Sequence, residues 1–327
     1  MIDVVNLCFN YQTYERRSGI KGGIQDFFHR QTVLKAALSG VSFTINDGEI
    51  VGLLGKNGAG KTTLTKILTG LVHPSSGQVR VDGFVPYEKK SKFLMQIGLV
   101  LGQKSQLNWD LPAMATLRLL KAIYHLSDAN FDSRLAELLH LLGLEALIDT
   151  PVRKLSLGER MKFDLTCALL HRPKVLFLDE PTIGLDWESQ QAVHTFLKTV
   201  NKQQGTTIML TSHYMKDIEA LAGRILMLSK GELVIDKTVD ALLRQYSGQT
   251  VLSLLTGEKR DFSYPGTDVR VTDRGMDIVF AADSAVRTDD VLRALQQQDI
   301  VIESVSTSRL PLEDILYDVY QKGSADV

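Results

Sequence analysis

Cysteine is scarce in this sequence. Only two of the 327 residues are cysteines, Cys8 and Cys167, and they lie far apart and outside any Cys-x-x-Cys spacing. This pattern excludes a disulfide framework and a thiolate metal site, and it is typical of small buried side chains in a reducing compartment. An excess of one charge is also lacking, because 37 Lys and Arg stand against 38 Asp and Glu, a formal net charge of -1. The chain therefore has no overall positive field, and we expect no nucleic-acid partner.

Long hydrophobic runs are missing as well. The most apolar stretch, 138–148, is interrupted by His140 and Glu145, whereas a membrane-spanning helix needs about 20 apolar residues. The first residues carry no basic segment before an apolar one, so we expect no secretory signal. Any role at a membrane must then depend on another chain. The sequence does contain 44 % hydrophobic and 23 % charged residues, which is typical of a folded protein, and its length suits two domains.

Short apolar runs that alternate with helical patterns indicate an α/β fold. The β-rich runs 175–178 and 206–210 are separated by a helical pattern, which favours a parallel sheet. The dipeptide Asp47-Gly48 predicts a hairpin between the strands on either side of it. The other elements expected before residue 245 are strands at 2–7, 40–45, 49–54 and 78–82, a hairpin over 224–236 that turns at Lys230-Gly231, and helices at 61–69, 117–124, 131–142 and 159–170.

The character of the sequence changes after about residue 245. We expect residues 1–245 to form the main domain and 246–327 a separate small α+β domain. This second region contains no cluster of residues suited to catalysis. Its expected elements are strands at 250–255, 269–272, 277–281 and 301–307 and helices at 286–297 and 312–321.

The strongest chemical signal is a glycine-rich loop between an expected strand and an expected helix. Its residues fit the spacing G-x-x-x-x-G-K-[ST]. Glycines allow backbone N–H groups to surround phosphate oxygens, and the helix N-terminus adds partial positive charge. We expect Lys61 to reach the β- and γ-phosphates and Thr62 to bind Mg²⁺. An ordinary glycine-rich turn is the plainer alternative, which the complete spacing disfavours. The expected cofactor-binding residues here are Gly55, Lys56, Asn57, Gly58, Ala59, Gly60, Lys61, Thr62 and Thr63.

An apolar strand that ends in two carboxylates further narrows the class of phosphate-binding protein. Residues 175–178 lead into Asp179 and Glu180, and open α/β sheets bind ligands at the carboxyl ends of their strands. We expect Asp179 to hold Mg²⁺ and Glu180 to orient and polarise an attacking water. The alternative is a strand that runs into an exposed acidic loop without a role in binding. The phosphate-binding motif elsewhere in the sequence disfavours this alternative.

The glycine-rich loop followed along the chain by the strand with its acidic pair resembles the arrangement in the ATP-binding subunits of ABC transporters, and the family's other motifs stand at their expected places. Gln103 lies at the family's Q-loop position, where the resemblance implies that it senses Mg²⁺ and the attacking water. Residues 155–159 stand at the signature motif, residues 182–186 match the D-loop, and His213 occupies the switch-histidine position. The resemblance covers about residues 1–240. It implies catalytic roles for Glu180, His213, Gln103 and Lys61, and metal binding by Thr62, Gln103 and Asp179.

The signature motif departs from the family pattern at two positions. Ser156 and Gly158 fit it, whereas Leu157 and Glu159 replace the usual Gly and Gln. Ser156-x-x-Glu159 is also a capping box for the following helix, which explains the spacing without a ligand. The two interpretations are compatible, because a capped helix N-terminus aimed at a γ-phosphate is an anion site. The resemblance implies that Ser156, Gly158 and the D-loop residue Asp186 help to bind ATP, with Glu159 adding a negative charge nearby.

Tyr11 follows the first strand, where the family stacks an aromatic ring on adenine. The segment from Tyr11 to Leu38 is longer than family members usually have there. Apolar residues recur in it at helical spacing after a basic lead-in, which predicts an inserted amphipathic helix over about 19–35. We favour packing of this helix on its own β-subdomain. Contact with a membrane subunit or with anionic headgroups remains the alternative.

The resemblance implies a fold and an activity together. The expected fold is an α/β, P-loop NTPase domain of the ABC type, with a parallel sheet core, an antiparallel β-subdomain, a helical subdomain near 104–172 and the small C-terminal α+β domain. The expected activity is ATP hydrolysis with ATP and Mg²⁺ as cofactors. Two cassettes bind ATP head to tail, and we expect the second to be another copy of this chain.

The expected partners are integral membrane transporter subunits, on the cytoplasmic face of the cell membrane. The loop 103–112, which contains Trp109, further resembles exporters of drugs and polysaccharides, so export is the expected direction. The alternative is an ABC-type ATPase that acts in solution on nucleic acid or ribosomes. One cassette, with only short helices between the phosphate-binding loop and the signature, disfavours that alternative.

Overall fold

Two compact units make up the structure, a computed structural model of the chain. They comprise residues 1–236 and 237–327, and each is described by itself. The sequence predicted a division at 245/246, whereas the structure assigns residues 237–245 to the second unit. The residues that the structure describes are 1–14, 32–102, 104–212, 214–246, 249–281 and 286–317.

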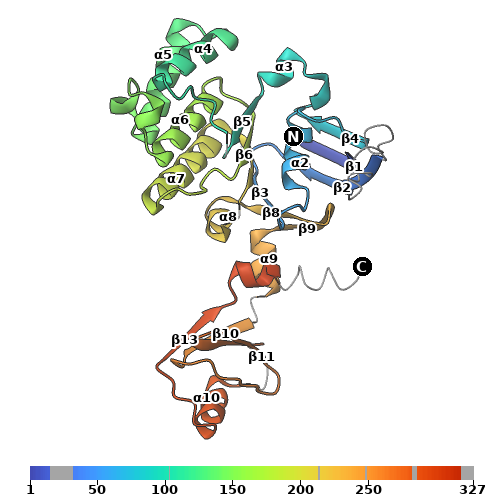
Figure 1. Cartoon of the computed structure of the whole chain (residues 1–327), viewed down its shortest axis with the longest axis vertical. Coiled ribbons are helices and arrows are strands. Elements are labelled where there is room, and N and C mark those ends of the chain that lie inside the picture. The colour runs from blue at the N-terminus through green and yellow to red at the C-terminus, as the bar shows by residue number, and fades with distance from the viewer. Residues whose placement is uncertain (15–31, 103, 213, 247–248, 282–285, 318–327) are drawn as a thin grey trace, which may run out of the picture. The chain divides into compact units, whose positions relative to one another are not determined.

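A mostly parallel sheet of six strands forms the core of the first unit (Figure 1). Its strands are β3 (Ile50–Leu54), β5 (Ile97–Leu101), β6 (Val175–Asp179), β7 (Thr207–Thr211), β8 (Arg224–Ser229) and β9 (Glu232–Thr238). The strand order is β5-β6-β7-β3-β8-β9, and every pair from β5 to β8 is parallel. This confirms the predicted parallel sheet. A two-residue turn at Lys230-Gly231 joins β8 to its neighbour β9, as predicted.

A second, antiparallel sheet of three strands lies against the core sheet. Its strands are β1 (Ile2–Tyr14), β2 (Thr32–Ile45) and β4 (Ser76–Val81), in the order β2-β1-β4. β1 and β2 extend well past their expected ends as a two-stranded arm, in which Tyr11 pairs with Lys35 and Gln12 with Leu34. This is the antiparallel β-subdomain that the family resemblance implied.

Two predictions in this region were wrong. Residues 32–35, expected at the end of an inserted helix, belong to β2 and pair with β1, because here backbone pairing with β1 prevails over the local helical pattern. The rest of that predicted helix, 19–31, lies outside the described residues. The Asp47-Gly48 turn forms, but it links two sheets and closes no hairpin, since β2 pairs with β1 and β3 pairs with β7 and β8.

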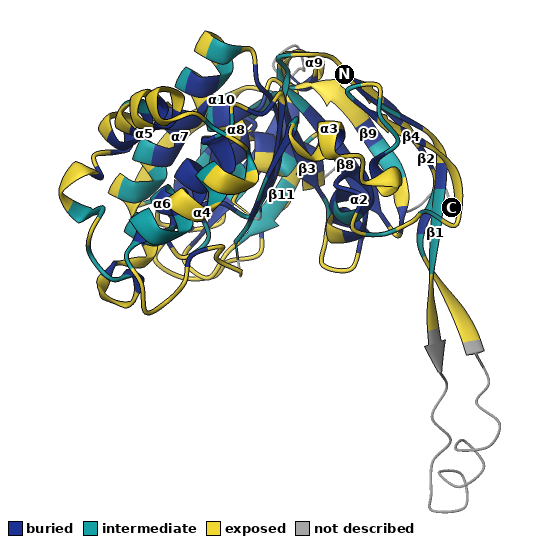
Figure 2. Cartoon of the chain, turned by 90° about the horizontal axis from the view of Figure 1, so that it is seen from above, coloured by how far each residue is buried: buried dark blue, intermediate teal, exposed yellow. Residues whose placement is uncertain are grey.

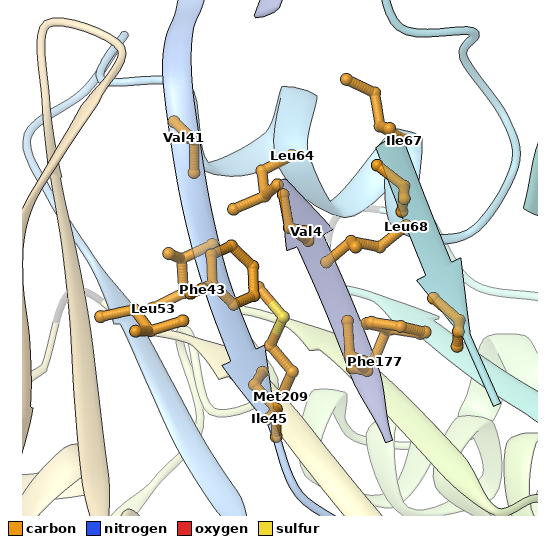
Figure 3. Packing of buried hydrophobic residues seen from close by; sticks show 14 of the residues in the cluster. Val4, Val41, Phe43, Ile45, Leu53, Leu64, Ile67, Leu68, Phe177 and Met209 are labelled. Atoms are coloured by element: carbon orange, nitrogen blue, oxygen red, sulfur yellow. The ribbon is translucent and has the colours of Figure 1, made fainter. Parts of the chain in front are cut away.

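The main hydrophobic cluster fills the space between the two sheets. Phe43 of β2, Leu64 of helix α2 (Lys61–Leu68) and Phe177 of β6 lie together in it, and each is at most 6 % exposed. Figure 3 shows how side chains from both sheets and from α2 meet there. Burial at about 25 cal/mol per Å² makes this cluster the main support of the elements that carry the loop before α2.

Helices cover the other face of the core sheet (Figures 1 and 2). The longer ones are α4 (Ala113–Ile123), α5 (Asp128–Leu142), α6 (Leu157–Leu169) and α7 (Trp187–Gln204). Arg134 of α5, 2 % exposed, donates to Leu169 O at 3.2 and 3.0 Å and to Gln204 Oε1 at 3.0 Å, so it ties α5 to the ends of α6 and α7. The shorter helical segments are η1 (Pro86–Glu88), α3 (Ser91–Leu94), η2 (Glu145–Leu147), η3 (Val152–Lys154) and α8 (Met215–Leu221).

The second unit is built on a four-stranded antiparallel sheet. Its order is β11-β12-β10-β13, and α10 packs on one face through Val291 and Leu295. Tyr246 packs in a second cluster with Val251 and Ile315. Its elements are α9 (Val239–Gln245), β10 (Gln249–Leu255), β11 (Asp268–Val271), β12 (Gly275–Ala281), α10 (Thr288–Gln297), β13 (Ser304–Arg309) and a helical turn over 312–317.

Membrane-spanning helices were sought throughout the described parts of both units. None of the helices found there combines the length and the apolar character that crossing a bilayer requires.

Candidate functional site

The glycine-rich loop joins β3 to α2 at the carboxyl end of the core sheet. Gly55 and Gly60 have φ of 146° and 109°, and a Cβ at either would lie 2.4 Å from Leu228 O or 2.6 Å from Ala37 O. Only glycine fits such backbone, so neighbouring strands fix the loop's path. Gly60 is the N-cap of α2 and offers no side-chain cap. The glycines therefore fix the path of the loop into the first turn of α2, the segment for which the sequence predicts phosphate binding.

Lys61 is held inside this loop. Its Nζ donates to Gly55 O at 2.5 Å and to Lys56 O at 3.2 Å, and the residue is only 8 % exposed. Burial lowers the pKa of Lys61, while the charges of Glu180 and Asp179 act in the opposite direction. An ammonium group therefore lies near two carboxylates at the mouth of the loop.

The two carboxylates are positioned by the end of the neighbouring strand β7. The Thr211 hydroxyl donates to Asp179 Oδ1 at 2.6 Å. Glu180 N donates to Thr211 O and to Thr211 Oγ1, both at 3.1 Å. Gly102 N donates to Asp179 O at 2.7 Å. Two segments on either side of β6 thus determine where the acidic pair lies.

Glu180 has a left-handed backbone, with φ of 55°. A non-glycine residue in that region costs about 1–3 kcal/mol and persists only where the surrounding structure imposes it. The hydrogen bonds to Thr211 supply that constraint on the N-terminal side. Strain of this kind is concentrated at functional sites, which agrees with the predicted role of Glu180.

A pocket of about 320 Å³ opens beside the loop, within the usual size range for small-molecule sites. Tyr11 of β1 lies at its rim, 39 % exposed, with its hydroxyl 3.0 Å from Thr63 Oγ1 and its ring edge-on to Phe9 at 4.8 Å. An aromatic wall beside phosphate-binding backbone suits a nucleotide. The lining residues are Tyr11, Lys35, Ala36, Ala37, Asn57, Gly58, Gly60, Lys61, Thr62, Thr63 and Glu180.

The residues of the signature and D-loop lie together at the starts of α6 and α7. The predicted capping box is present, since Ser156 and Glu159 exchange hydrogen bonds. Asp186 caps α7 by accepting from Ser189 N at 2.8 Å and from Ser189 Oγ at 3.0 Å. A Cβ at Gly158 would lie 2.3 Å from Ser189 Oγ, so the two helix starts are packed tightly against each other.

The predicted site residues thus fall into two groups within one chain. Tyr11 and Glu180 line one pocket together with residues 57, 58 and 60–63, whereas the predicted loop residues Gly55, Lys56 and Ala59 are not part of its lining. Asp179 directly precedes Glu180. The second group lies at the starts of α6 and α7, where Ser156 and Asp186 are exposed and Gly158 is buried. Gln103 and His213 lie outside the described residues. Sequence reasoning missed Thr211, although its place at the end of a strand next to 175–179 was an available signal. It also missed the pocket residues 35–37, which it had assigned to the inserted helix or to no element.

Similarities to known proteins agree with this geometry. A family profile described as "ABC transporter" matches residues 38–183. The linearmycin resistance ATP-binding protein LnrL of Bacillus subtilis is 33 % identical over 231 residues, which cover 71 % of this chain and 72 % of that protein. The daunorubicin resistance ATP-binding protein DrrA3 of Streptomyces coeruleorubidus is 33 % identical over 286 residues, which cover 86 % of this chain and 90 % of that protein.

Solved structures agree as well. One of an ATP-binding subunit of an ABC transporter superposes with a TM-score of 0.63 at 26 % identity, covering 76 % of this chain and 93 % of that one. The predicted family and fold class are confirmed by these matches. This chain belongs to the ABC transporter family as an ATP-binding subunit, and it is an ATPase.

Proposed function

We propose that this chain drives export through separate membrane subunits, and that Glu180 orients the water that cleaves ATP. The observation that carries the hydrolytic part is the meeting of a loop-bound ammonium, Lys61, with a strained carboxylate, Glu180, at one pocket. The relatives named for linearmycin and daunorubicin resistance support export as the direction.

The phosphates bind at the loop and at Lys61. Backbone N–H groups at the start of α2 and the Lys61 ammonium stabilise the negative charge that spreads over the γ-phosphoryl oxygens during transfer. Tyr11, whose hydroxyl lies 3.0 Å from Thr63 Oγ1, offers its ring to the adenine. Ala36 and Ala37 leave room beside that ring because their side chains are small.

The residues of the site suit Mg²⁺, which shares its ligands between protein and phosphate, better than a metal ion whose ligands all come from the protein. Among the described residues, no three His, Cys, Asp or Glu side chains form a ready-made metal cluster. Mg²⁺ is usually held by one or two protein oxygens together with substrate phosphates. The Thr62 hydroxyl and the Asp179 carboxylate are such oxygens, and a bound Mg²⁺ would neutralise charge on the β- and γ-phosphates.

Glu180 completes the reaction by acting on water. Its carboxylate accepts a hydrogen bond from the water whose oxygen attacks the γ-phosphorus, while the bond to the β–γ bridging oxygen breaks and ADP leaves. The fixed backbone at Glu180 contributes by positioning, since most of the barrier reduction in phosphoryl transfer comes from orientation and charge.

We also propose that two copies of this chain act together head to tail. Ser156 and Asp186 are exposed and do not line the pocket of the same chain, so they are available to the ATP held by a second copy. ATP then closes the dimer and hydrolysis opens it. Integral membrane subunits convert this motion into transport on the cytoplasmic side, and the second unit, residues 237–327, serves assembly or regulation.

The hydrolytic role is tested with Glu180→Gln, which keeps the shape of the side chain and removes its charge. Phosphate release should fall about 10²–10⁴-fold, whereas affinity for Mg-ATP should persist. Size-exclusion chromatography with Mg-ATP should show an accumulated dimer. The matched control is Glu219→Gln, at an exposed position on α8, which should behave as wild type. Hydrolysis by Glu180→Gln at a near wild-type rate would show that another group activates the water.

The transport role needs a separate measurement. The tagged chain should be extracted from its own membranes in mild detergent in a complex with a multi-span membrane protein, and the complex should hydrolyse ATP. Recovery of the chain only on its own, from membranes and supernatant alike, would contradict the proposed partners while leaving the hydrolytic assignment intact.

A further inference from the structure

A single buried carboxylate, Asp217, joins the two segments that flank the hydrolytic site. It lies in the first turn of α8 and is 1 % exposed. Its Oδ2 accepts from Ser212 Oγ at 2.6 Å and from the Thr182 hydroxyl. Thr182 follows Glu180 by two residues, and Ser212 follows Thr211, which holds Asp179 and Glu180 from the other side.

A buried histidine fixes the orientation of that carboxylate. His194, on α7 and 4 % exposed, donates from Nε2 to Asp217 Oδ1 at 2.8 Å. The remaining ring nitrogen, Nδ1, is buried without a hydrogen-bond partner, so the bond to Asp217 is the contact that orients the ring. Burial alone would raise the pKa of Asp217, but the hydrogen bonds from His194, Ser212 and Thr182 outweigh it and lower that pKa. Asp217 is thus a buried carboxylate that accepts hydrogen bonds from three side chains.

This arrangement constrains both sides of the strained residue. The Thr211 hydrogen bonds hold Glu180 from its N-terminal side, and the Thr182–Asp217 bond holds the chain two residues after it. A backbone in the left-handed region persists only when it is over-determined in this way. Through His194 and Ser212, the same carboxylate also ties α7, which is capped by Asp186, to the end of β7.

We propose that Asp217 is a positioning residue for ATP hydrolysis, oriented by His194. It acts on the reaction by holding Thr182 and Ser212 at fixed positions relative to each other. The Glu180 carboxylate is thereby held against the pocket. This inference rests on the proposed hydrolytic role of Glu180. It assigns no contact between Asp217 and ATP, so the nucleotide affinity should not depend on it.

The first test replaces the charge in full-length protein. Asp217→Asn should lower kcat about 10- to 100-fold, the scale expected for a small misplacement of a reacting group, with the Kd for a fluorescent ATP analogue within about twofold of wild type. The matched control is Asp240→Asn, an exposed aspartate in the first turn of the seven-residue helix α9, which should retain the wild-type kcat. An unchanged kcat for Asp217→Asn, or a Kd that rises as much as kcat falls, would overturn the inference.

Variants of the donors cover the case in which Asp217→Asn does not fold. Thr182→Val keeps the shape of threonine and removes its hydroxyl, so it should lower kcat with Kd retained, whereas Thr182→Ser should restore the rate. His194→Gln keeps a donor near the Nε2 position and should preserve most of kcat, whereas His194→Leu should lower it. Equal rates within each pair would contradict the proposal.

A combination with Glu180→Gln separates this inference from the function on which it rests. If Asp217 works through Glu180, Asp217→Asn should cause no further loss of turnover in the Glu180→Gln protein. An additive loss would show that Asp217 acts by another route. Full turnover by Glu180→Gln itself would instead refute the hydrolytic assignment, whatever Asp217→Asn does.

Discussion

Ser156 and Glu159 exchange two hydrogen bonds at the start of α6. Ser156 N donates to Glu159 Oε2 at 2.7 Å, and Glu159 N donates to Ser156 Oγ at 3.2 Å. The carboxylate is therefore tied to its own helix N-terminus, where it offsets the partial positive charge that would otherwise favour an anion. In the proposed dimer this helix start faces the γ-phosphate of the other copy, so Glu159 should weaken closure.

Glu159→Gln should strengthen ATP-dependent dimerisation. Glutamine keeps an oxygen acceptor for Ser156 N but removes the negative charge, so the ATP concentration for half-maximal dimerisation should fall about 2- to 5-fold, as expected for one charge at a helix terminus. The measurement is an ATP titration by size-exclusion chromatography in the Glu180→Gln background. The difference should shrink at high salt, because exposed charges are screened. A weaker dimer would contradict this account of Glu159.

Thr211→Val should impair turnover more than nucleotide binding. Valine has the shape of threonine, but it cannot donate to Asp179 Oδ1 or accept from Glu180 N. We expect kcat to fall about tenfold or more, since the acidic pair loses the hydroxyl that orients it. Thr211→Ser retains the hydroxyl and should stay within about threefold of wild type. Steady-state kinetics of the two variants make the comparison, and equal rates would mean that the hydroxyl is dispensable.

Acid should destabilise the protein through His171. Burial lowers the pKa of His171 to about 4, although a hydrogen bond to Ile97 O acts in the opposite direction. In the unfolded chain the histidine binds a proton near pH 6.5. Between these values the unfolded state holds more protons, so the free energy of unfolding falls as the pH drops from 6.5 towards 4. Through this one group, the free energy of unfolding should be about 2 kcal/mol lower at pH 5 than at pH 7.

The measurement is urea unfolding of wild type and His171→Gln at pH 7 and pH 5. Glutamine can still donate to Ile97 O but does not titrate, so the variant should lose less stability on acidification. His125→Gln is the matched control, because His125 is exposed, and its pH dependence should equal that of wild type. Identical pH dependence in all three proteins would assign the acid sensitivity to other groups.

Two leucines, one in α2 and one just after it, should differ sharply in their contribution to stability. Leu64 of α2 is 0 % exposed in the cluster between the sheets, whereas Leu71 is 55 % exposed. Leu64→Ala should lower the free energy of unfolding by about 2–5 kcal/mol through lost burial and a cavity. Leu71→Ala should change it by about 0.5 kcal/mol or less. Equal losses in chemical denaturation would mean that the cluster can collapse around the missing side chain.

The parts of the site that are contiguous in the sequence were predictable. The loop 55–62 carries its own glycines, its lysine and the start of its helix, and the run 175–180 carries both its burial and its carboxylates. The capping box was also predictable, because the two residues that exchange hydrogen bonds are three positions apart. In each case the physical cause and the residues that express it lie within one short window.

The remainder depends on partners distant in the sequence. Asp217 meets His194 and Thr182 across 23 and 35 residues, and none of the three carries a local pattern that announces the contact. The Asp47-Gly48 turn looked like a hairpin because turn residues report a change of direction, while the strand that pairs after it is chosen elsewhere. Residues 32–35 join β2 because β1 provides a pairing edge, which no local periodicity could reveal.

The place of β3 in the core sheet has a consequence for the order of synthesis. β3 ends at residue 54, but its two neighbours, β7 and β8, lie at 207–211 and 224–229. At ordinary elongation rates the ribosome needs roughly 8 to 30 seconds to add the intervening residues. During that interval the strand before the glycine-rich loop is an apolar segment with both edges unpaired, and segments of this kind are prone to aggregation. ATP can bind only to chains in which β3 has already paired with β7 and β8.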